Sequence, residues 1–462
     1  MTLPDLDVFE LFRLALGLAV PWQVMSVEFD QEGGTLKIGL DFPRGSRFSC
    51  PEAACVNKAC AVHDAMEQTW RHLDFFELQA YLVARVPRVD CPTHGVHLVS
   101  VPWARPGSGF TLLMDIAMLT FAKQMPIAPL AKIARVHDTR IWRVIEHHVG
   151  ASRASLDFSG VTKVGCDETS AKRGQDYVSL VMDLEERRVM FATPGKDADT
   201  VKAFADDLSA HGGDPKTQVE EVCCDMSPAF IKGIAEHLAT QPDNEANEDA
   251  GRDTTIEPIS VASDAPLTPV VPSTEGDQGV VTVVHRPEIV FDRYHVVAKA
   301  NEAVDEVRRS ESKTRAELKR SRYVWLKNES NLTAKKREQL TWLTRPSMRL
   351  ATARAARWRD DFNGFYDKST PEEAEAHPTS WCYGAKRSRL EPIKAFVKTV
   401  EAHWEAIIAW QTNRLSNGLL EGTNSLVQAA KTRAHGYRSK EKMITIIYLI
   451  AGKLPLPEIH TI

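Results

Sequence analysis

Three acidic residues stand where carboxylates can hold a pair of divalent cations. Asp167 follows the apolar run Val-Gly-Cys, Asp225 follows Val-Cys-Cys, and Glu421 lies far downstream in Asn-Gly-Leu-Leu-Glu-Gly-Thr-Asn-Ser. Carboxylate oxygens are the hard ligands that suit Mg²⁺ or Mn²⁺. Two such ions can activate an attacking oxygen and stabilise the leaving oxygen of an in-line displacement. The set therefore points to phosphodiester chemistry.

The elements that must position these acids follow an α/β pattern from residue 161 onward. Strands are predicted at 161–166, 176–183, 188–193, 217–224 and 288–291, with helices at 199–208 and 228–238. This order is that of an RNase H-like sheet, in which the first and fourth strands lie side by side and bring Asp167 and Asp225 to one cation. Glu168 points to the opposite face of its strand, which makes Asp167 the better ligand.

A late helical stretch, residues 421–454, is predicted to deliver Glu421 to the same pocket. Leu426 and Val427 are expected to pack this helix on the sheet. Asp292 and His295 follow the fifth strand and are assigned a supporting role. They would contact DNA near the scissile phosphate or order the junction between strand and helix.

Soft metal ligands cluster nearer the N-terminus. Cys50 and Cys55 form one pair, and Cys91-Pro-Thr-His94 forms a second. Four Cys and His ligands suit tetrahedral zinc, and four protein ligands make the site structural rather than catalytic because no position stays open. The five-residue spacing of the first pair is wide, so Cys60 or His63 is an alternative to one member.

The first hundred residues otherwise have a β pattern. A short amphipathic helix is predicted at 6–18, and a hairpin at 22–29 and 35–42 with glycines in its turn. A second strand pair is predicted at 69–73 and 78–86. The two prolines and the glycine of 101–107 indicate a linker.

Residues 110–149 are predicted to be helical, with two helices at 127–135 and 138–149. Asp138 is the expected N-cap of the second helix. This spacing is typical of a helix-turn-helix, which would place Thr139, Arg140 and Arg143 in a major groove. A plain helical hairpin gives the same pattern.

The net charge of −5 hides a segregation of charge. Residues 241–292 hold 11 acidic against 2 basic side chains, and 242–281 is read as a mobile acidic insertion. Residues 301–360 hold 16 basic against 8 acidic side chains in a region predicted to be helical from 294 to 410, with a break at 361–379. The basic stretch can follow a phosphate backbone, although a solvated helical face has a similar composition.

Composition also bounds the compartment and the number of domains. The 462 residues are too many for one ordinary core, and no apolar run is long enough for a membrane span. The acidic N-terminus does not resemble a signal peptide. The cysteine usage suits a reducing cytoplasm better than a disulfide framework.

Several segments together resemble the DDE transposases of the ISL3 family of bacterial insertion sequences. They are Thr69-Trp-Arg-His-Leu-Asp-Phe-Phe, Ala84-Arg-Val-Pro-Arg-Val-Asp-Cys-Pro-Thr-His-Gly, Val101-Pro-Trp-Ala-Arg, Val164-Gly-Cys-Asp-Glu-Thr, Phe291-Asp-Arg-Tyr-His-Val and Ser416-Asn-Gly-Leu-Leu-Glu-Gly-Thr-Asn-Ser-Leu-Val-Gln-Ala-Ala-Lys. The chain departs from the family pattern in its wide Cys50–Cys55 spacing and its long acidic segment.

The resemblance implies a multidomain α/β protein. Its expected parts are an N-terminal helix and hairpin (1–47), a zinc-binding domain (48–105), a helix-turn-helix (110–150), an RNase H-like core (160–295), an α-helical insertion (296–415) and the C-terminal helices of the core (416–462).

The resemblance also implies a reaction. Asp167, Asp225 and Glu421 would be the catalytic triad for hydrolysis at the transposon ends, after which the freed 3′-hydroxyl attacks target DNA. Double-stranded DNA is the expected partner, bound by at least a dimer in the bacterial cytoplasm at the nucleoid, without a membrane.

Basic and aromatic residues are expected to assist DNA binding. Lys431, Arg433, Arg438 and Lys440 would bind beside the active site. Trp325, Trp342 or Trp358 could stack on a flipped base, although a tryptophan in such a stretch is more often a core residue. Two other classes fit part of the pattern: a catalytically silent DNA-binding regulator, and a nuclease without strand transfer.

Overall fold

The computed structural model describes residues 7–172, 174, 176–240, 285–368, 370–413 and 418–458. Two compact units divide the chain: residues 1–154 with 429–462, and residues 155–428. The predicted acidic insertion at 242–281 lies outside the described residues. Among the described helices, none is long and apolar enough to cross a membrane.

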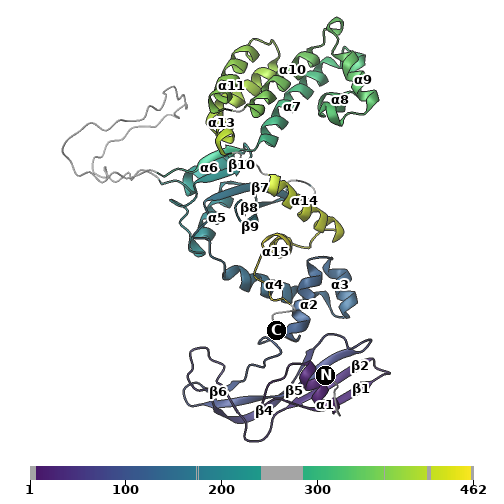
Figure 1. Ribbon diagram of the computed structural model, residues 1–462, viewed down its shortest axis with the longest axis vertical. Helices are drawn as coiled ribbons and strands as arrows, with labels where there is room; N and C mark the ends of the chain where they lie inside the picture. The colour runs from purple at the N-terminus through teal and green to yellow at the C-terminus, as the bar shows by residue number, and fades with distance from the viewer. Residues whose placement is uncertain are drawn as a thin grey trace, which may run out of the picture. The chain divides into compact units, whose positions relative to one another are not determined.

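The first unit contains a six-stranded sheet (Figure 1). Its strands are β1 (Gln23–Asp30), β2 (Thr35–Asp41), β3 (Arg47–Phe48), β4 (Cys60–Arg71), β5 (Gln79–Cys91) and β6 (Gly95–Leu98). They follow the order β1-β2-β5-β4-β3, and β6 pairs with β5. The predicted hairpin is confirmed as the antiparallel pair β1–β2, and the second predicted pair is confirmed as longer strands, β4 and β5.

An aromatic cluster on this sheet incorporates the segment predicted to be a linker. The Trp103 ring lies 4.8 Å from that of Trp22 and 5.6 Å from that of Trp70, measured between centroids. Trp103 and Ala104 are buried. Residues 101–107 are irregular, as prolines favour, but they are anchored by apolar burial instead of linking freely.

The helices of the first unit are α1 (Val8–Ala15), α2 (Leu112–Ala122), α3 (Ile127–Ala134), α4 (Asp138–Ala154) and α15 (Lys440–Ala451). Thr111 caps α2, because its side chain accepts a hydrogen bond from the N–H of Met114. The C-terminal helix α15 packs against α4. The predicted segment 416–462 is therefore shared between the two units, and the other domain boundaries stay predictions.

The second unit is built on a five-stranded sheet in the order β11-β10-β7-β8-β9. The strands are β7 (Lys163–Lys172), β8 (Asp176–Asp183), β9 (Arg188–Pro194), β10 (Glu221–Cys224) and β11 (Glu288–Phe291). β7, β8 and β9 are antiparallel neighbours, whereas β10 runs parallel to both β7 and β11. The predicted adjacency of the first and fourth strands is confirmed, with Val164 opposite Val222.

Helices flank this sheet and continue into a bundle (Figure 1). The unit contains α5 (Ala198–Ala210), α6 (Pro228–His237), α7 (Arg293–Glu311), α8 (Arg322–Trp325), α9 (Ala334–Leu343), α10 (Ala351–Asn363), α11 (Pro371–Ala385), α12 (Glu391–Ala402), α13 (Trp404–Asn413) and most of α14 (Gly418–Arg433). One continuous hydrophobic core runs from the sheet into the bundle. The predicted helical break at 361–379 is wrong in length, because α11 already begins at Pro371 behind the cap Thr370.

Candidate active site, zinc centre and DNA-binding face

Two acids of the triad lie on neighbouring strands of the second unit, and the third lies on α14. Asp167 lies within β7, and Asp225 directly follows β10, where its Oδ1 accepts a hydrogen bond from the N–H of Ser227 at 2.9 Å. Glu421 lies in the first turn of α14 and is exposed. Parallel pairing of β7 with β10 thus brings two carboxylates to the same edge of the sheet.

Hydrogen bonds dock α14 on β7. Asn424 Nδ2 donates to Oδ2 of Asp167 at 2.7 Å, and Gln428 Nε2 donates to Oγ1 of Thr169 at 2.8 Å and to the carbonyl of Ser170 at 2.9 Å. Glu421, Asn424 and Gln428 are spaced three and four residues apart and share one helix face. The apolar contact is made by Leu420 and Val427, whereas Leu426, which was expected to pack on the sheet, is 44% exposed.

The pKa of Asp167 shows that the three carboxylates interact. Burial raises this pKa above its usual range, and the charges of Asp225 and Glu421 add to the rise. The N–H of Glu168, which donates to Asp167 Oδ1 at 2.7 Å, and the His295 ring oppose it. A carboxyl group whose pKa is raised by burial and by neighbouring carboxylates is the pattern that a bound cation relieves.

Glu168 carries a further perturbed carboxyl group. Burial raises the pKa of Glu168 to about 7, with further rises from Asp225 and Asp167 and an opposing effect of Lys196. Glu168 therefore lies within electrostatic range of both acids, although strand alternation places its side chain on the opposite face from that of Asp167.

The two supporting residues have different surroundings. Asp292 is buried and caps α7, because its Oδ1 accepts from the N–H of Tyr294 at 3.2 Å. This contact is the one expected of a residue that orders the junction between strand and helix. His295 is half-buried and lowers the pKa of Asp167, which puts its ring within electrostatic range of the triad.

The ligand atoms of the three predicted catalytic acids are not packed as closely as those of a closed metal site. Among the described residues, only the set Cys50, Cys55, Cys91 and His94 brings three or more potential ligand atoms within 4.8 Å of one another. The carboxylates of Asp167, Asp225 and Glu421 do not meet this distance, and they are linked by the effect of Asp225 and Glu421 on the pKa of Asp167. The catalytic roles of the three acids stay predictions. Asn424 was not among the predicted site residues, although it lies three residues after Glu421 on the same helix face.

The four predicted zinc ligands converge in the first unit. Sγ of Cys55 lies 3.6 Å from Sγ of Cys91, and Nδ1 of His94 lies 3.7 Å from Sγ of both Cys50 and Cys91. Tetrahedral zinc with Zn–S bonds of about 2.3 Å separates its sulfur ligands by about 3.8 Å. The donor set and its spacing therefore fit zinc, and the cluster is confirmed.

Hydrogen bonds favour the thiolate form of Cys91 in this cluster. Burial alone would raise the pKa of the Cys91 thiol, but donors that include the N–H groups of Thr93 and His94 lower it to about 5. Asn57 donates to Sγ of Cys91 at 3.4 Å through Nδ2 and to Sγ of Cys55 at 3.5 Å through its backbone N–H. The thiolate is the form that binds metal.

The two alternative ligands lie outside the set. Sγ of Cys60 is directed to the carbonyl of Asn57 at 3.8 Å, and His63 pairs with Asp64 at 3.4 Å. All eight cysteines are described and none forms a disulfide.

The second helix of the predicted helix-turn-helix is α4. Its start differs from the prediction, because the N–H of Thr139 donates to Nδ1 of His137 at 3.3 Å, so that His137 caps the helix in place of Asp138. Thr139 and Arg143 are exposed. Arg140 is partly engaged within the protein: its guanidinium stacks 4.0 Å from the centroid of Phe110 and donates to the carbonyl of Gly109 at 2.9 Å.

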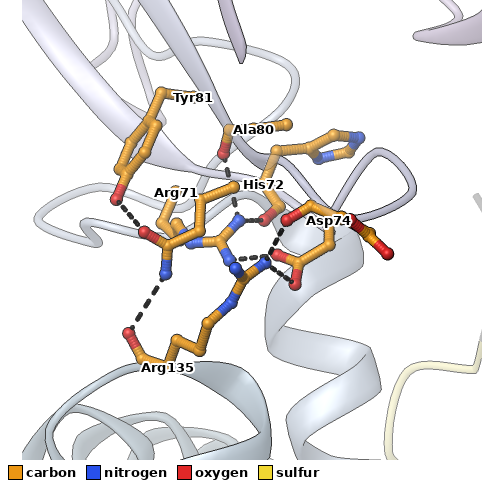
Figure 2. Close-up of polar contacts among 8 residues, drawn as sticks. Arg71, His72, Asp74, Ala80, Tyr81 and Arg135 are labelled. Atoms are coloured by element: carbon orange, nitrogen blue, oxygen red, sulfur yellow. Dashed lines mark hydrogen bonds and ion pairs between the residues drawn. The ribbon is translucent and has the colours of Figure 1, made fainter. Parts of the chain in front are cut away.

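A network of two arginines, one of them buried, joins the turn between α3 and α4 to the sheet (Figure 2). Asp74 accepts from Arg71 through one oxygen and from Arg135 through the other. The Arg71 side chain is 1% exposed and also donates to the carbonyls of His72 and Ala80. Arg135 lies in the turn itself, with a φ of 54°, and its side chain also donates to the carbonyl of Glu77 at 3.1 Å. These contacts fix the orientation of the helix pair on the zinc-binding sheet.

The C-terminal basic residues predicted to bind DNA lie in the same unit as α4. Nη2 of Arg438 lies 3.6 Å from Oδ2 of Asp138 at the start of α4, and the Arg438 side chain is 82% exposed. Arg433 donates to the carbonyl of Gln124 at 2.9 Å. Burial lowers the pKa of Lys431, and Lys440 begins α15. The N-terminus of α4 and Arg438 thus belong to one surface.

The three tryptophans expected to stack on a base have different exposures. Trp325 is 1% exposed and its indole N–H donates to Oγ of Ser321 at 3.1 Å, so this residue belongs to the core and does not stack on a base. Trp358 is half-buried and packs edge-on against Trp381. Trp342 on α9 is 41% exposed, so stacking on a base stays a prediction for this residue.

A zinc centre, a helix-turn-helix and a sheet with converging acids together define a DNA-transposition protein. Three family profiles match in the same order: the zinc finger of transposases IS204/IS1001/IS1096/IS1165 over residues 46–94, the helix-turn-helix domain of transposase family ISL3 over 99–149, and the ISL3-type DDE transposase over 164–242 and 277–447. The last match covers more than half of the chain, and the protein therefore belongs to the ISL3 family of DDE transposases.

Curated relatives span the whole chain. The transposase for insertion sequence element IS1557 of Mycobacterium tuberculosis is 26% identical over 97% of both chains. The transposase for insertion sequence element IS1001 of Bordetella parapertussis is 23% identical over 91% of this chain and 93% of its own. The resemblance stated from the sequence is confirmed, including its zinc-binding and helix-turn-helix domains.

Proposed function

We propose that this protein binds the terminal inverted repeats of an insertion sequence and catalyses metal-dependent cleavage and transfer of DNA strands. The observation that carries the proposal is the adjacency of Asp167 and Asp225 on paired strands, with the helix that carries Glu421 held against β7 through Asn424. Family membership supports the same reading.

We further propose that the catalytic core is RNase H-like and is interrupted by an α-helical insertion at 296–415. The support is the strand order β11-β10-β7-β8-β9, with β7, β8 and β9 antiparallel and β10 and β11 parallel to β7. Such a sheet places the ends of β7 and β10 side by side, which is what two metal-binding carboxylates require.

Two Mg²⁺ or Mn²⁺ ions are the proposed cofactors, and Asp167, Asp225 and Glu421 would hold them. The fit rests on the hard oxygen donors and on the raised pKa of Asp167, in which burial is joined by the charges of the other two acids. When bound, the ions stabilise negative charge on the scissile phosphate and favour ionisation of the attacking hydroxyl.

The residues of the chain position this chemistry. Asn424 and the N–H of Glu168 each donate to one oxygen of Asp167 and fix its carboxylate. Ser227 fixes Asp225 through its N–H. Protons compete with cations for Asp167, because its pKa is raised, so cleavage is expected to weaken as the pH falls towards that pKa.

DNA binding is assigned to the first unit, with Thr139, Arg140 and Arg143 on α4 and with Lys431, Arg433, Arg438 and Lys440 near the C-terminus. Exposure of Thr139, Arg143 and Arg438 supports phosphate or base contacts. Pairing of two transposon ends requires at least a dimer, which is the proposed assembly.

Arg143→Ala is expected to weaken binding to the inverted repeat by about tenfold, since one contact from a recognition helix is worth roughly 1–3 kcal/mol. The melting temperature should stay unchanged, because Arg143 is exposed. Arg140→Ala is the matched comparison on the same helix. It should lower the melting temperature, because Arg140 stacks on Phe110 and donates to Gly109. Fluorescence anisotropy and thermal denaturation test both variants, and unchanged affinity in Arg143→Ala would remove this residue from the interface.

Incubating purified protein with its inverted repeat and Mg²⁺ tests the proposed function. Cleavage followed by joining to target DNA is the expected result. Cleavage alone would instead identify a nuclease, and binding without cleavage would identify a regulator.

A further inference from the structure

Asn424 donates a hydrogen bond to the Asp167 carboxylate from a different secondary-structure element. It lies on α14, and its Nδ2 donates to Oδ2 of Asp167 at 2.7 Å and to the carbonyl of Glu168 at 3.4 Å. Both neighbours are acceptors only, so the amide nitrogen rather than the amide oxygen must face them.

The two oxygens of Asp167 are thus held by two different donors. Oδ1 accepts from the N–H of Glu168 at 2.7 Å, and Oδ2 accepts from Asn424. The first donor belongs to the same strand, whereas the second comes from the helix that carries Glu421. The bond from Asn424 therefore fixes the carboxylate of one triad member relative to the helix of another.

The oxygen atom of the Asn424 side-chain amide has different surroundings from the nitrogen. Oδ1 of Asn424 is buried and has no hydrogen-bond partner among the described residues. A buried acceptor without a partner is unfavourable, and at a functional site it indicates a group that binds there. An amide oxygen is a ligand type that magnesium sites use, either directly or through water.

We propose that Asn424 is a positioning residue that holds the Asp167 carboxylate for metal binding and presents its own Oδ1 to the metal site. The inference rests on the proposed function of the triad. A neutral donor suits this task. A lysine or arginine would compete with the cation for Asp167, and an aspartate at this position would repel the Asp167 carboxylate.

Asn424→Ala is expected to raise the Mn²⁺ concentration at half-saturation by about tenfold, since a hydrogen bond to a charged group is worth roughly one power of ten in affinity or more. The EPR signal of free Mn²⁺ measures this binding to the full-length protein in complex with its inverted repeat. The Mg²⁺ concentration for half-maximal cleavage should rise by the same factor. Zinc content and DNA affinity should match those of the wild type.

Gln428→Ala is the matched control. Gln428 lies one turn further along the same face and donates to Thr169 and Ser170 without touching Asp167. Because its bonds to Thr169 and Ser170 dock the helix, its loss should lower the melting temperature and leave the Mn²⁺ midpoint unchanged. An equal shift in both variants would mean that Asn424 only docks the helix, and a wild-type midpoint in Asn424→Ala would likewise overturn the inference.

Asp225→Asn separates this inference from the proposed function. If Asp225→Asn loses cleavage while Asn424→Ala binds Mn²⁺ like the wild type, the triad stands and the role of Asn424 fails. If Asp225→Asn cleaves at the wild-type rate, the proposed function itself fails.

Discussion

Asp225→Asn is expected to lower the rate of strand cleavage by at least about a hundredfold while leaving binding to the inverted repeat intact. The substitution keeps the size of the side chain and removes its negative charge. A neutral amide is a weaker ligand for Mg²⁺ than a carboxylate, so the charge on the scissile phosphate loses its stabilisation. The oxygen that accepts from the N–H of Ser227 at 2.9 Å is retained, so the turn after β10 should persist.

Asp157→Asn provides a control with the same local geometry. Oδ1 of Asp157 also accepts from the N–H of the residue two positions on, Ser159, at 2.9 Å. Asp157 is not among the charges that act on Asp167 or Glu168. Gel assays of cleavage and binding with both variants decide the point. Cleavage by Asp225→Asn at the rate of Asp157→Asn would exclude Asp225 from the catalytic triad.

Local sequence patterns were sufficient for the sheet and for two of its acids. Alternation and apolar runs predicted five strands, and the order of strands and helices predicted that the first and fourth are neighbours. The parallel pairing of β7 with β10 confirms this neighbourhood. Asp167 and Asp225 could therefore be placed together without knowledge of any side-chain contact, because adjacency of strands is a property of topology.

The rotation of α14 about its axis could not be predicted in the same way. The helix carries two apolar pairs, Leu419 with Leu426 and Leu420 with Val427, each spaced by seven residues. Either pair can face the sheet by periodicity alone. The structure buries Leu420 and Val427 and exposes the other pair, and this choice brings Asn424 to Asp167.

Side-chain burial in the helical bundle was equally hard to predict. Tryptophan is both a stacking residue and a core residue, and a basic stretch does not distinguish the two uses. Trp325 belongs to the core and Trp342 is exposed. The difference depends on helices distant in sequence, since Trp325 is enclosed in a core shared by α7 and α10.

Cys91→Ser is expected to release zinc and to abolish specific binding to the inverted repeat. Cys91 ends β5, whereas Cys50 and Cys55 precede β4. A zinc ion bound by these residues would therefore hold the end of β5 to the segment that leads into β4. Structural zinc contributes roughly 10 kcal/mol or more in peptides that lack another core. Here the aromatic cluster of Trp22, Trp70 and Trp103 should preserve the opposite part of the sheet.

Cys60→Ser separates loss of zinc from loss of a buried thiol. Cys60 is buried beside the cluster, but its Sγ is directed to the carbonyl of Asn57 and lies outside the four-ligand set. Elemental analysis should find one zinc ion per chain in Cys60→Ser and none in Cys91→Ser. Hydrogen exchange should increase around residues 48–60 and 91–97 in Cys91→Ser only. Retention of zinc by Cys91→Ser would remove Cys91 from the ligand set, and loss of zinc in Cys60→Ser would show that Cys60 takes the place of one member of the set.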